Sequence, residues 1–308
     1  MPMILKMQAE RKYGYNMKYQ DVWQWGTEQL RKQNIGEDKL DARLLLEYVC
    51  GTDRNTLLVH GDREVSESEQ ERYQLLIEKR AQHVPLQHLT GEQEFMGLTF
   101  KVNKHVLVPR QDTEILVEEV MKNLHDGMRI LDMCTGSGCI LLSLLQYSND
   151  CQGVGVDLSA EALKVAEENY ARLKAEKPEM DATFIQSNLF AAMDVALQDQ
   201  QSGKLGEKFD IIVSNPPYIR TDVIDTLMPE VREHEPLTAL DGTADGLHFY
   251  REITKEAKNY LNRGGMLYYE IGYDQAAEVT AIMQAEGFQE IEVVKDFAGL
   301  DRVVYGIY

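Results

Sequence analysis

The segment FDIIVSNPPYI, residues 209–219, combines residue types that suit one kind of reaction. The Asn215 side-chain oxygen and a nearby backbone carbonyl, such as that of Pro216, can each accept one N–H of a flat NH2 group on an amide or a base. Two acceptors would hold this weak nucleophile in line with an electrophile and offset its developing positive charge. Tyr218 can stack on the flat group. We therefore predict that Asn215, Pro216 and Tyr218 are catalytic and that Asn215, Pro216, Pro217 and Tyr218 bind the substrate.

This segment also predicts the position of the Asn-Pro-Pro-Tyr loop in the fold. Residues 209–213 are mostly β-branched and apolar, which is typical of a strand buried on both faces of a parallel sheet. The two prolines that follow prevent both helix and further strand pairing, and each favours an extended residue before it. We expect a rigid loop at the carboxyl end of a central strand, where open α/β sheets bind ligands. The alternative is a Pro-Pro turn that only ends the strand.

A second motif lies upstream and favours a nucleoside. A strand at 129–132 is followed by the loop Met133–Gly138, a helix from Cys139 to about Tyr147, and a strand at 152–156 that ends in Asp157. An acidic residue at that point can accept both hydroxyls of a ribose. The dinucleotide fingerprint GxGxxG and a Walker lysine are absent, so the loop need not hold a pyrophosphate. These features favour S-adenosylmethionine over NAD.

The third strand, at about 183–186, precedes Asn188, whose side chain could reach the adenine edge. The alternatives are a surface cap for Asp157 and a helix cap for Asn188. The predicted cofactor-binding residues are Cys134, Thr135, Gly136, Ser137, Gly138, Asp157, Asn188, Leu189 and Asn215.

Strands and helices alternate from Met128 onward, which predicts an α/β doubly wound sheet. A helix at 246–262 is expected to end at Gly264-Gly265, before a fifth strand at 266–271. Glu270 near the end of that strand either faces the site or is a structural carboxylate. A helix at 274–286 precedes two last strands, at 288–294 and 302–308, which we expect to form an antiparallel hairpin. The polar stretch 195–208 is predicted to be a surface loop.

The first third of the chain has a different pattern. Residues 21–81 have helical periodicity, with a capping box at Ser66–Glu69, and short strand-like runs follow at 89–108. We predict four regions: a disordered extension at 1–16, a helical domain of three or four helices at 17–85, a β-hairpin linker at 86–110 and a catalytic domain at 111–308.

Composition excludes several classes of function. The chain has 308 residues and a formal net charge of −19, without a dense run of Lys or Arg, which argues against direct nucleic-acid binding. No apolar run approaches the ~20 residues that span a membrane, and a signal peptide is not evident. The four cysteines lack CxxC spacing, which indicates neither zinc nor disulfides. We expect a cytoplasmic protein without a metal.

The chain resembles the protein-glutamine methyltransferases of the PrmC/HemK family. The resemblance runs from about Asp21 to the end, and its motifs are HLTGEQEFMGLTFKV (88–102), LVPRQDTE (107–114), SNPPYI (214–219), EHEPLTAL (233–240) and DFAGLDRVVYG (296–306), with the Asp132 loop, Asp157 and the strand end Glu270–Gly272. It implies a seven-stranded Rossmann-like class I methyltransferase domain after a small all-α domain.

The resemblance also implies an activity. Members of this family are transferases that methylate class I peptide-chain release factors, and thereby tune translation termination. The accepting glutamine lies in a Gly-Gly-Gln tripeptide. By this resemblance the cofactor lies across the loop Cys134–Gly138 with Asp157 on its ribose, and S-adenosylhomocysteine is the product. Asn215–Tyr218 would hold the glutamine amide, and the helical domain would help to engage the release factor. We expect a monomer.

One position departs from the family. The first residue of the loop is usually Gly and is Cys134 here, and DMCTGSGCI also resembles a sister family that methylates a glutamine of a large-subunit ribosomal protein. That activity is the main alternative, although PRQDTE and the DxxGxxR ending at Arg302 resemble the release-factor enzymes. We assign Cys134 a packing role, because methyl transfer to an amide needs no covalent intermediate. A DNA or RNA amino-methyltransferase and a non-catalytic binding protein are further alternatives.

Overall fold

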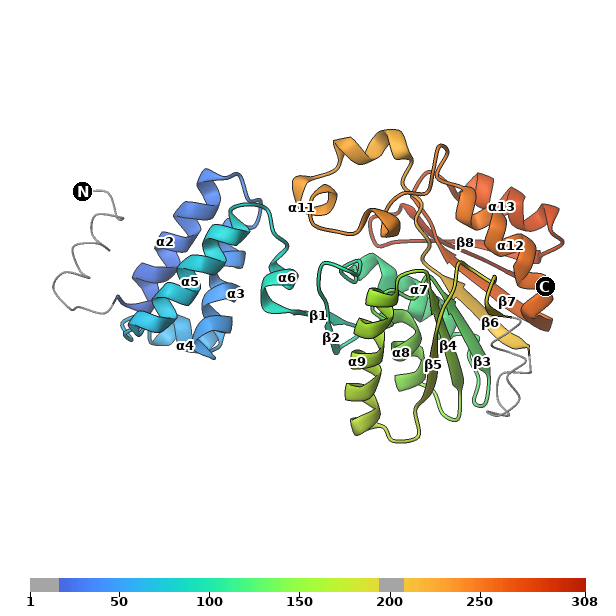
Figure 1. Cartoon of the computed structure of the whole chain (residues 1–308), viewed down its shortest axis with the longest axis horizontal. Coiled ribbons are helices and arrows are strands. Elements are labelled where there is room, and N and C mark those ends of the chain that lie inside the picture. Colours follow the sequence, from blue (N-terminus) through green and yellow to red (C-terminus); the bar gives the residue numbers. More distant parts are fainter. Residues whose placement is uncertain (1–16, 194–207) are drawn as a thin grey trace. The chain divides into compact units, whose positions relative to one another are not determined.

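A computed structural model describes residues 17–193 and 208–308 of the chain (Figure 1). The predicted extension at 1–16 and almost all of the predicted loop at 195–208 lie outside the described residues. The chain divides into two compact units, Met1–Gly91 with Pro229–His234, and Glu92–Met228 with Glu235–Tyr308. Within the described residues, no helix combines the length and apolarity needed to cross a bilayer.

The first unit is helical. Its capping box is confirmed, because the Ser66 side chain accepts from the Glu69 backbone N–H and the Glu69 side chain accepts from the Ser66 N–H. Gly51, with a φ of 56°, ends the second helix in the left-handed conformation that glycine adopts at low cost. The helices are α2 (Tyr19–Lys32), α3 (Asp38–Cys50), α4 (Arg54–Val59), α5 (Glu67–Arg80), α6 (Leu86–Thr90) and α11 (Pro229–Arg232).

A buried arginine holds α11 in this unit, whereas the sequence pattern predicts residues 229–234 in the catalytic domain. Arg80 is 5% exposed. Its Nε donates to Asp41 at 2.7 Å and its Nη2 to Glu230 at 2.9 Å. Burial raises the pKa of Asp41, and the guanidinium beside it opposes that rise. A buried guanidinium with two carboxylate partners is much less costly than an unpaired charge, so this cluster fixes the position of α11 on the helical unit.

Gly26 in α2 marks a tight contact in the same unit. A Cβ at this position would lie 2.0 Å from the Tyr73 hydroxyl oxygen, and that hydroxyl donates to the Ala42 carbonyl at 2.9 Å. Alanine normally stabilises a helix interior by about 1 kcal/mol relative to glycine. Here we expect Gly26→Ala to lower the free energy of unfolding of the helical unit by about 1–3 kcal/mol, because Tyr73 must move.

Urea unfolding followed by tryptophan fluorescence measures this effect. Both tryptophans of the chain, Trp23 and Trp25, lie in α2 and report on this unit. Gly36→Ala is the control, since nothing lies within 4 Å of a Cβ there. Adding Tyr73→Phe should recover part of the loss. A stabilised Gly26→Ala protein would show that the contact is loose.

The second unit contains the predicted hairpin and sheet. Strands β1 (Glu92–Phe95) and β2 (Leu98–Lys101) pair antiparallel. The seven-stranded sheet has the order β5-β4-β3-β6-β7-β9-β8, with β9 antiparallel to both neighbours. This confirms the predicted Rossmann-like sheet and its closing hairpin. The sheet strands are β3 (Arg129–Met133), β4 (Gln152–Asp157), β5 (Asp181–Gln186), β6 (Phe209–Ser214), β7 (Leu261–Glu270), β8 (Gln289–Lys295) and β9 (Asp301–Ile307).

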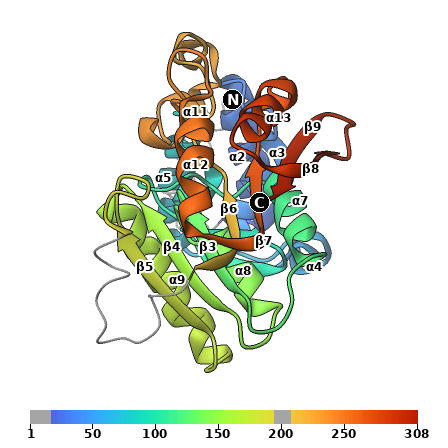
Figure 2. The same cartoon turned by 90° about the vertical axis from the view of Figure 1, so that its right-hand side faces the viewer.

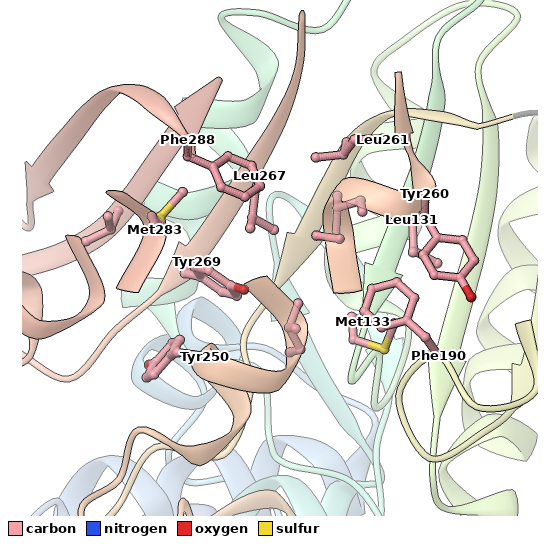
Figure 3. Packing of buried hydrophobic residues seen from close by; sticks show 14 of the residues in the cluster. Leu131, Met133, Phe190, Tyr250, Tyr260, Leu261, Leu267, Tyr269, Met283 and Phe288 are labelled. Atoms are coloured by element: carbon pink, nitrogen blue, oxygen red, sulfur yellow. The ribbon is translucent and has the colours of Figure 1, made fainter. Parts of the chain in front are cut away.

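Helices cover both faces of this sheet (Figures 1 and 2). One layer consists of α7 (Gln111–Met121), α8 (Cys139–Gln146) and α9 (Ala160–Glu176), and the other of α12 (His248–Tyr260) and α13 (Ala276–Ala285). Successive side chains of a strand point to opposite faces of the sheet, so each strand contributes to both cores. Ile130 of β3 packs in the core under α7 and α8, and Leu131 packs in the core under α12 and α13. Figure 3 shows the second core, where Phe190 stacks on Tyr260 with ring centroids 4.6 Å apart.

The structure corrects one boundary. The helix predicted at 246–262 ends at Tyr260, and β7 begins at the next residue. Gly264 and Gly265, predicted to terminate the helix, lie inside β7, where the pairing with β6 shifts register between Phe209 and Ile211. Gly264 has a φ of 80°. The glycine pair therefore allows an irregular strand rather than a helix end. Two 3-10 turns, Thr221–Thr226 and Leu237–Ala239, lie between β6 and α12.

Candidate active site

The predicted site residues follow the carboxyl ends of neighbouring parallel strands. Met133 at the end of β3 pairs with Val156 of β4 on one side and with Ser214 of β6 on the other. Asp157 at the end of β4 pairs with Gln186 of β5. Because these strands are parallel and in register, the loops after them meet at one edge of the sheet.

The loop after β3 turns sharply under two backbone hydrogen bonds. The Thr135 N–H donates to the Val156 carbonyl, and the Gly138 N–H donates to the Thr135 carbonyl, both at 2.9 Å. The Thr135 hydroxyl donates to Asp132 Oδ2 at 2.6 Å. Burial raises the pKa of the Asp132 carboxyl to about 7, and this hydrogen bond opposes the rise. Asp132, near the end of β3, thus fixes the loop through its contact with Thr135.

Asp157 joins the loop to the end of β4. Its Oδ2 accepts from the Gly136 N–H at 2.9 Å and its Oδ1 from the Ser159 N–H at 2.8 Å. Burial raises the pKa of Asp157, and these backbone donors oppose the rise by stabilising the carboxylate. A carboxylate has about four lone-pair sites, so each oxygen can accept a further hydroxyl.

These loops surround a cavity of about 290 Å³. Its walls combine apolar side chains, such as Ile140 and Phe249, with polar groups of the strand-end loops. Nine predicted site residues line it: Cys134, Thr135, Gly136, Ser137, Asp157, Asn188, Leu189, Asn215 and Pro217.

Three predicted residues are not in this lining. Gly138 packs inward, because a Cβ there would lie 3.1 Å from Leu142 and 3.2 Å from Ala166. With a φ of 78° it is also the N-cap residue of α8, so its geometry fits helix packing, and its predicted cofactor contact stays a prediction. Pro216 and Tyr218 lie in the same loop as Asn215 but outside the cavity wall.

Tyr218 is held from two sides. Its hydroxyl donates to Glu270 Oε1 at 3.3 Å, and its carbonyl accepts from Gln275 Nε2 at 3.1 Å. Gly242 leaves no room for a side chain against the Tyr218 backbone, since a Cβ there would lie 2.7 Å from its Cα. Burial raises the pKa of the Tyr218 phenol. The segment after β6 is therefore a fixed platform, as the two prolines predict.

Several cavity residues were not singled out as site residues. Thr113 on the first turn of α7 and Arg110 before it line the cavity. Arg110 Nη2 donates to both oxygens of Glu235, at 2.7 and 2.8 Å, and Glu235 is 7% exposed. This ion pair ties the segment before α7 to the segment that contributes Pro236 to the lining. These residues belong to the motifs LVPRQDTE and EHEPLTAL. The motifs were the sequence feature that could have identified them as site residues.

Cys134 has a φ of 65°, in the left-handed region that favours glycine. Its thiol packs against the core under α12 and α13. Burial, with Asp157 and Asp132 nearby, raises the pKa of the thiol, so it stays protonated near neutral pH. The geometry agrees with the packing role expected for this residue.

The left-handed backbone gives a testable order of stability. This conformation costs an L-residue about 1–2 kcal/mol. The free energy of unfolding of Cys134→Gly should therefore be about 1 kcal/mol higher than that of Cys134→Ala. Both variants lose the thiol, which isolates the backbone effect. Denaturant unfolding followed by circular dichroism measures the difference. The opposite order, which holds in ordinary helices and strands, would mean that the loop relaxes out of this conformation.

Comparison with known proteins finds two matching family models and several similar proteins. A family model described as PrmC N-terminal domain matches residues 21–91, and one described as methyltransferase domain matches residues 124–295. The chain is 42% identical to the release factor glutamine methyltransferase of Clostridium acetobutylicum over 87% of this chain and 90% of that protein. It is 41% identical to that of Caulobacter vibrioides, over 93% and 95%.

A crystal structure is also similar to this chain. The protein-(glutamine-N5) methyltransferase (release factor-specific) of Alicyclobacillus acidocaldarius is 28% identical, over 68% of this chain and 98% of that one, with a TM-score of 0.38. On the sequence matches, which extend over nearly the whole of both curated relatives, the chain belongs to the release factor glutamine methyltransferase family.

Proposed function

We propose that this chain methylates the side-chain amide nitrogen of the glutamine in the Gly-Gly-Gln motif of class I peptide-chain release factors. One observation carries the proposal: Asn215 lines the same cavity as the Cys134–Ser137 loop and Asp157. An amide-binding group and a nucleoside-binding loop thus share one space. The names of relatives about 40% identical to this chain point to the same substrate.

The cavity residues fit S-adenosylmethionine. Asp157 retains acceptor capacity for ribose hydroxyls, Asn188 can meet the adenine edge, and the apolar wall suits an adenine ring. The short loop after β3 has no lysine for phosphates. When bound, S-adenosylmethionine supplies an electrophilic methyl group on a positively charged sulfur.

The chain's own residues then orient the nucleophile. The Asn215 Oδ1 and the Pro216 carbonyl accept the two N–H groups of the glutamine amide, and Tyr218 packs beside it. The two N–H groups become stronger donors as positive charge develops on the nitrogen, so both oxygens stabilise the transition state more than the ground state. The proton can leave after the new N–C bond forms, so the proposal needs no general base.

Partner recognition is assigned to the helical unit. It comprises residues 17–91 with 229–234 and includes the segment that matches the PrmC N-terminal domain. We propose that it contacts the release factor outside the Gly-Gly-Gln loop, and that the protein acts as a monomer in the cytoplasm.

A paired assay tests the proposal. Purified protein and S-adenosylmethionine are incubated with an unmethylated release factor in one tube and an unmethylated large-subunit ribosomal protein in the other. Peptide mass mapping should locate one methyl group on the Gly-Gly-Gln glutamine. Methylation of the ribosomal protein alone would replace the proposed substrate with the main alternative.

A further inference from the structure

Asn215 contacts a second polar side chain at the cavity wall. Its Nδ2 donates to Thr113 Oγ1 at 3.4 Å, although the two residues are 102 positions apart. Thr113 is 3% exposed, and both residues line the cavity. Thr113 lies on the first turn of α7 and Asn215 directly follows β6, so the contact depends on two rigid elements.

The direction of this contact matters chemically. The amide of Asn215 has an acceptor oxygen and a donor nitrogen on opposite sides of one carbon. If the nitrogen faces Thr113, the oxygen is left for the N–H groups of a substrate amide. If the amide were reversed, an NH2 group would face the substrate NH2 group, and two donors cannot hydrogen-bond each other.

Thr113 is the acceptor in this contact, and the Asn215 nitrogen is the donor. A threonine hydroxyl has one proton to donate and lone pairs to accept with. Accepting from the Asn215 NH2 group uses a lone pair and leaves the Thr113 proton for another acceptor.

The buried Glu270 carboxyl interacts with the Thr113 hydroxyl. It is 2% exposed, and its Oε1 accepts from the Tyr218 hydroxyl at 3.3 Å. Burial raises the pKa of Glu270, whereas Thr113, the Arg302 guanidinium and Tyr218 oppose the rise. Arg302 in turn pairs with Asp296 at 2.9 Å and with Asp112 at 3.2 Å.

We infer that Thr113 is a positioning residue for methyl transfer: its hydroxyl accepts from the Asn215 NH2 group and so keeps Oδ1 turned towards the substrate nitrogen. The inference rests on the proposed function, because it assigns Asn215 the role of amide acceptor. Thr113 itself acts through Asn215.

Two variants of Thr113 test this role. Thr113→Val keeps the shape but removes the hydroxyl, and Thr113→Ser keeps the hydroxyl. We expect kcat to fall about tenfold in Thr113→Val, the effect of one neutral hydrogen bond. Thr113→Ser should stay within about threefold of the wild type. The Kd of S-adenosylhomocysteine should be unchanged in both. Equal kcat in the valine and wild-type proteins, or equal losses in both variants, would overturn the inference.

A double variant separates positioning from general packing. If Thr113 acts only through Asn215, then adding Thr113→Val to Asn215→Ala should cause no further loss of single-turnover rate. Additive losses would mean that Thr113 acts elsewhere. These rates are measured on whichever glutamine substrate the wild-type protein methylates, so a wrong release-factor assignment is detected first and separately.

A spectroscopic readout does not depend on turnover. The side-chain NH2 signals of Asn215 in a 15N-labelled protein are identified by their loss in Asn215→Ala. We expect them to shift in Thr113→Val and to remain near their wild-type positions in Thr113→Ser. Unshifted signals in the valine variant would show that the Asn215 NH2 group does not contact the hydroxyl, which would overturn the inference even in a protein without activity.

Discussion

Asn215→Ala should lower kcat for glutamine methylation by about 100- to 1,000-fold, the effect of losing one preorganised transition-state hydrogen bond. The side chain lines the cavity, and its nitrogen faces Thr113, which leaves Oδ1 for the substrate. The neighbouring prolines and the contacts of Tyr218 with Glu270 and Gln275 should keep the loop in shape. The defect should therefore appear in turnover.

The test compares turnover with ligand affinity. Methyl incorporation at saturating substrates gives kcat, and calorimetry gives the Kd of S-adenosylhomocysteine. We expect this Kd to change by less than about threefold, because the proposal assigns the Asn215 oxygen to the substrate amide. Asn149→Ala is the matched control, because Asn149 is an exposed asparagine whose side chain contacts Asp126. It should keep wild-type kcat. A comparable loss of cofactor affinity in Asn215→Ala would assign Asn215 to the cofactor instead.

Asp157→Ala should have the opposite profile, with the Kd of S-adenosylhomocysteine raised by about 100-fold. A hydrogen bond to a charged group contributes about 1.5–3 kcal/mol, and the proposal gives this carboxylate two ribose hydroxyls. The variant also removes the acceptor of the Gly136 N–H, which fixes the loop. At saturating cofactor, kcat should fall much less, because the amide-binding loop is untouched.

Two controls separate ribose recognition from loss of charge. Glu161→Ala removes an exposed carboxylate from the start of α9, where its partner is Lys164 at 2.6 Å. It should leave the Kd unchanged. A ligand analogue without the ribose 2′-hydroxyl should lose less affinity on Asp157→Ala than the parent ligand does. Equal losses for both ligands would mean that Asp157 acts through the loop and makes no ribose contact.

Local sequence patterns were enough to predict the strand ends that position the site. Short apolar, β-branched runs such as 209–213 can satisfy their backbone only in the interior of a sheet, and prolines or glycines must end them. The structure confirms these strands, and β3 and β6 end at Met133 and Ser214, one residue later than predicted. Because parallel strands have their carboxyl ends at one edge, the meeting of Cys134–Ser137, Asp157 and Asn215 at one cavity followed from the pattern.

Contacts between distant segments were not predictable in the same way. Asp112 has a residue type that caps helices, yet α7 begins one position earlier and Asp112 pairs with Arg302 of β9. Gly138 belongs to a glycine loop that suits ligand binding, but its inward face is filled by α8 and α9. In both cases the residue type alone does not specify these contacts, which depend on segments distant in the sequence.

Residue patterns along the chain were enough to predict the fold class, the two motifs and the amide chemistry, since these depend on periodicity and on residue types a few positions apart. The direction in which the Asn215 amide is turned became evident from the folded structure, through its contact with Thr113. The folded structure also placed α11 in the helical unit, through Arg80. Hydrogen bonds of this kind join residues more than 50 positions apart, and their direction is fixed only when packing excludes water and leaves each polar group with one available partner.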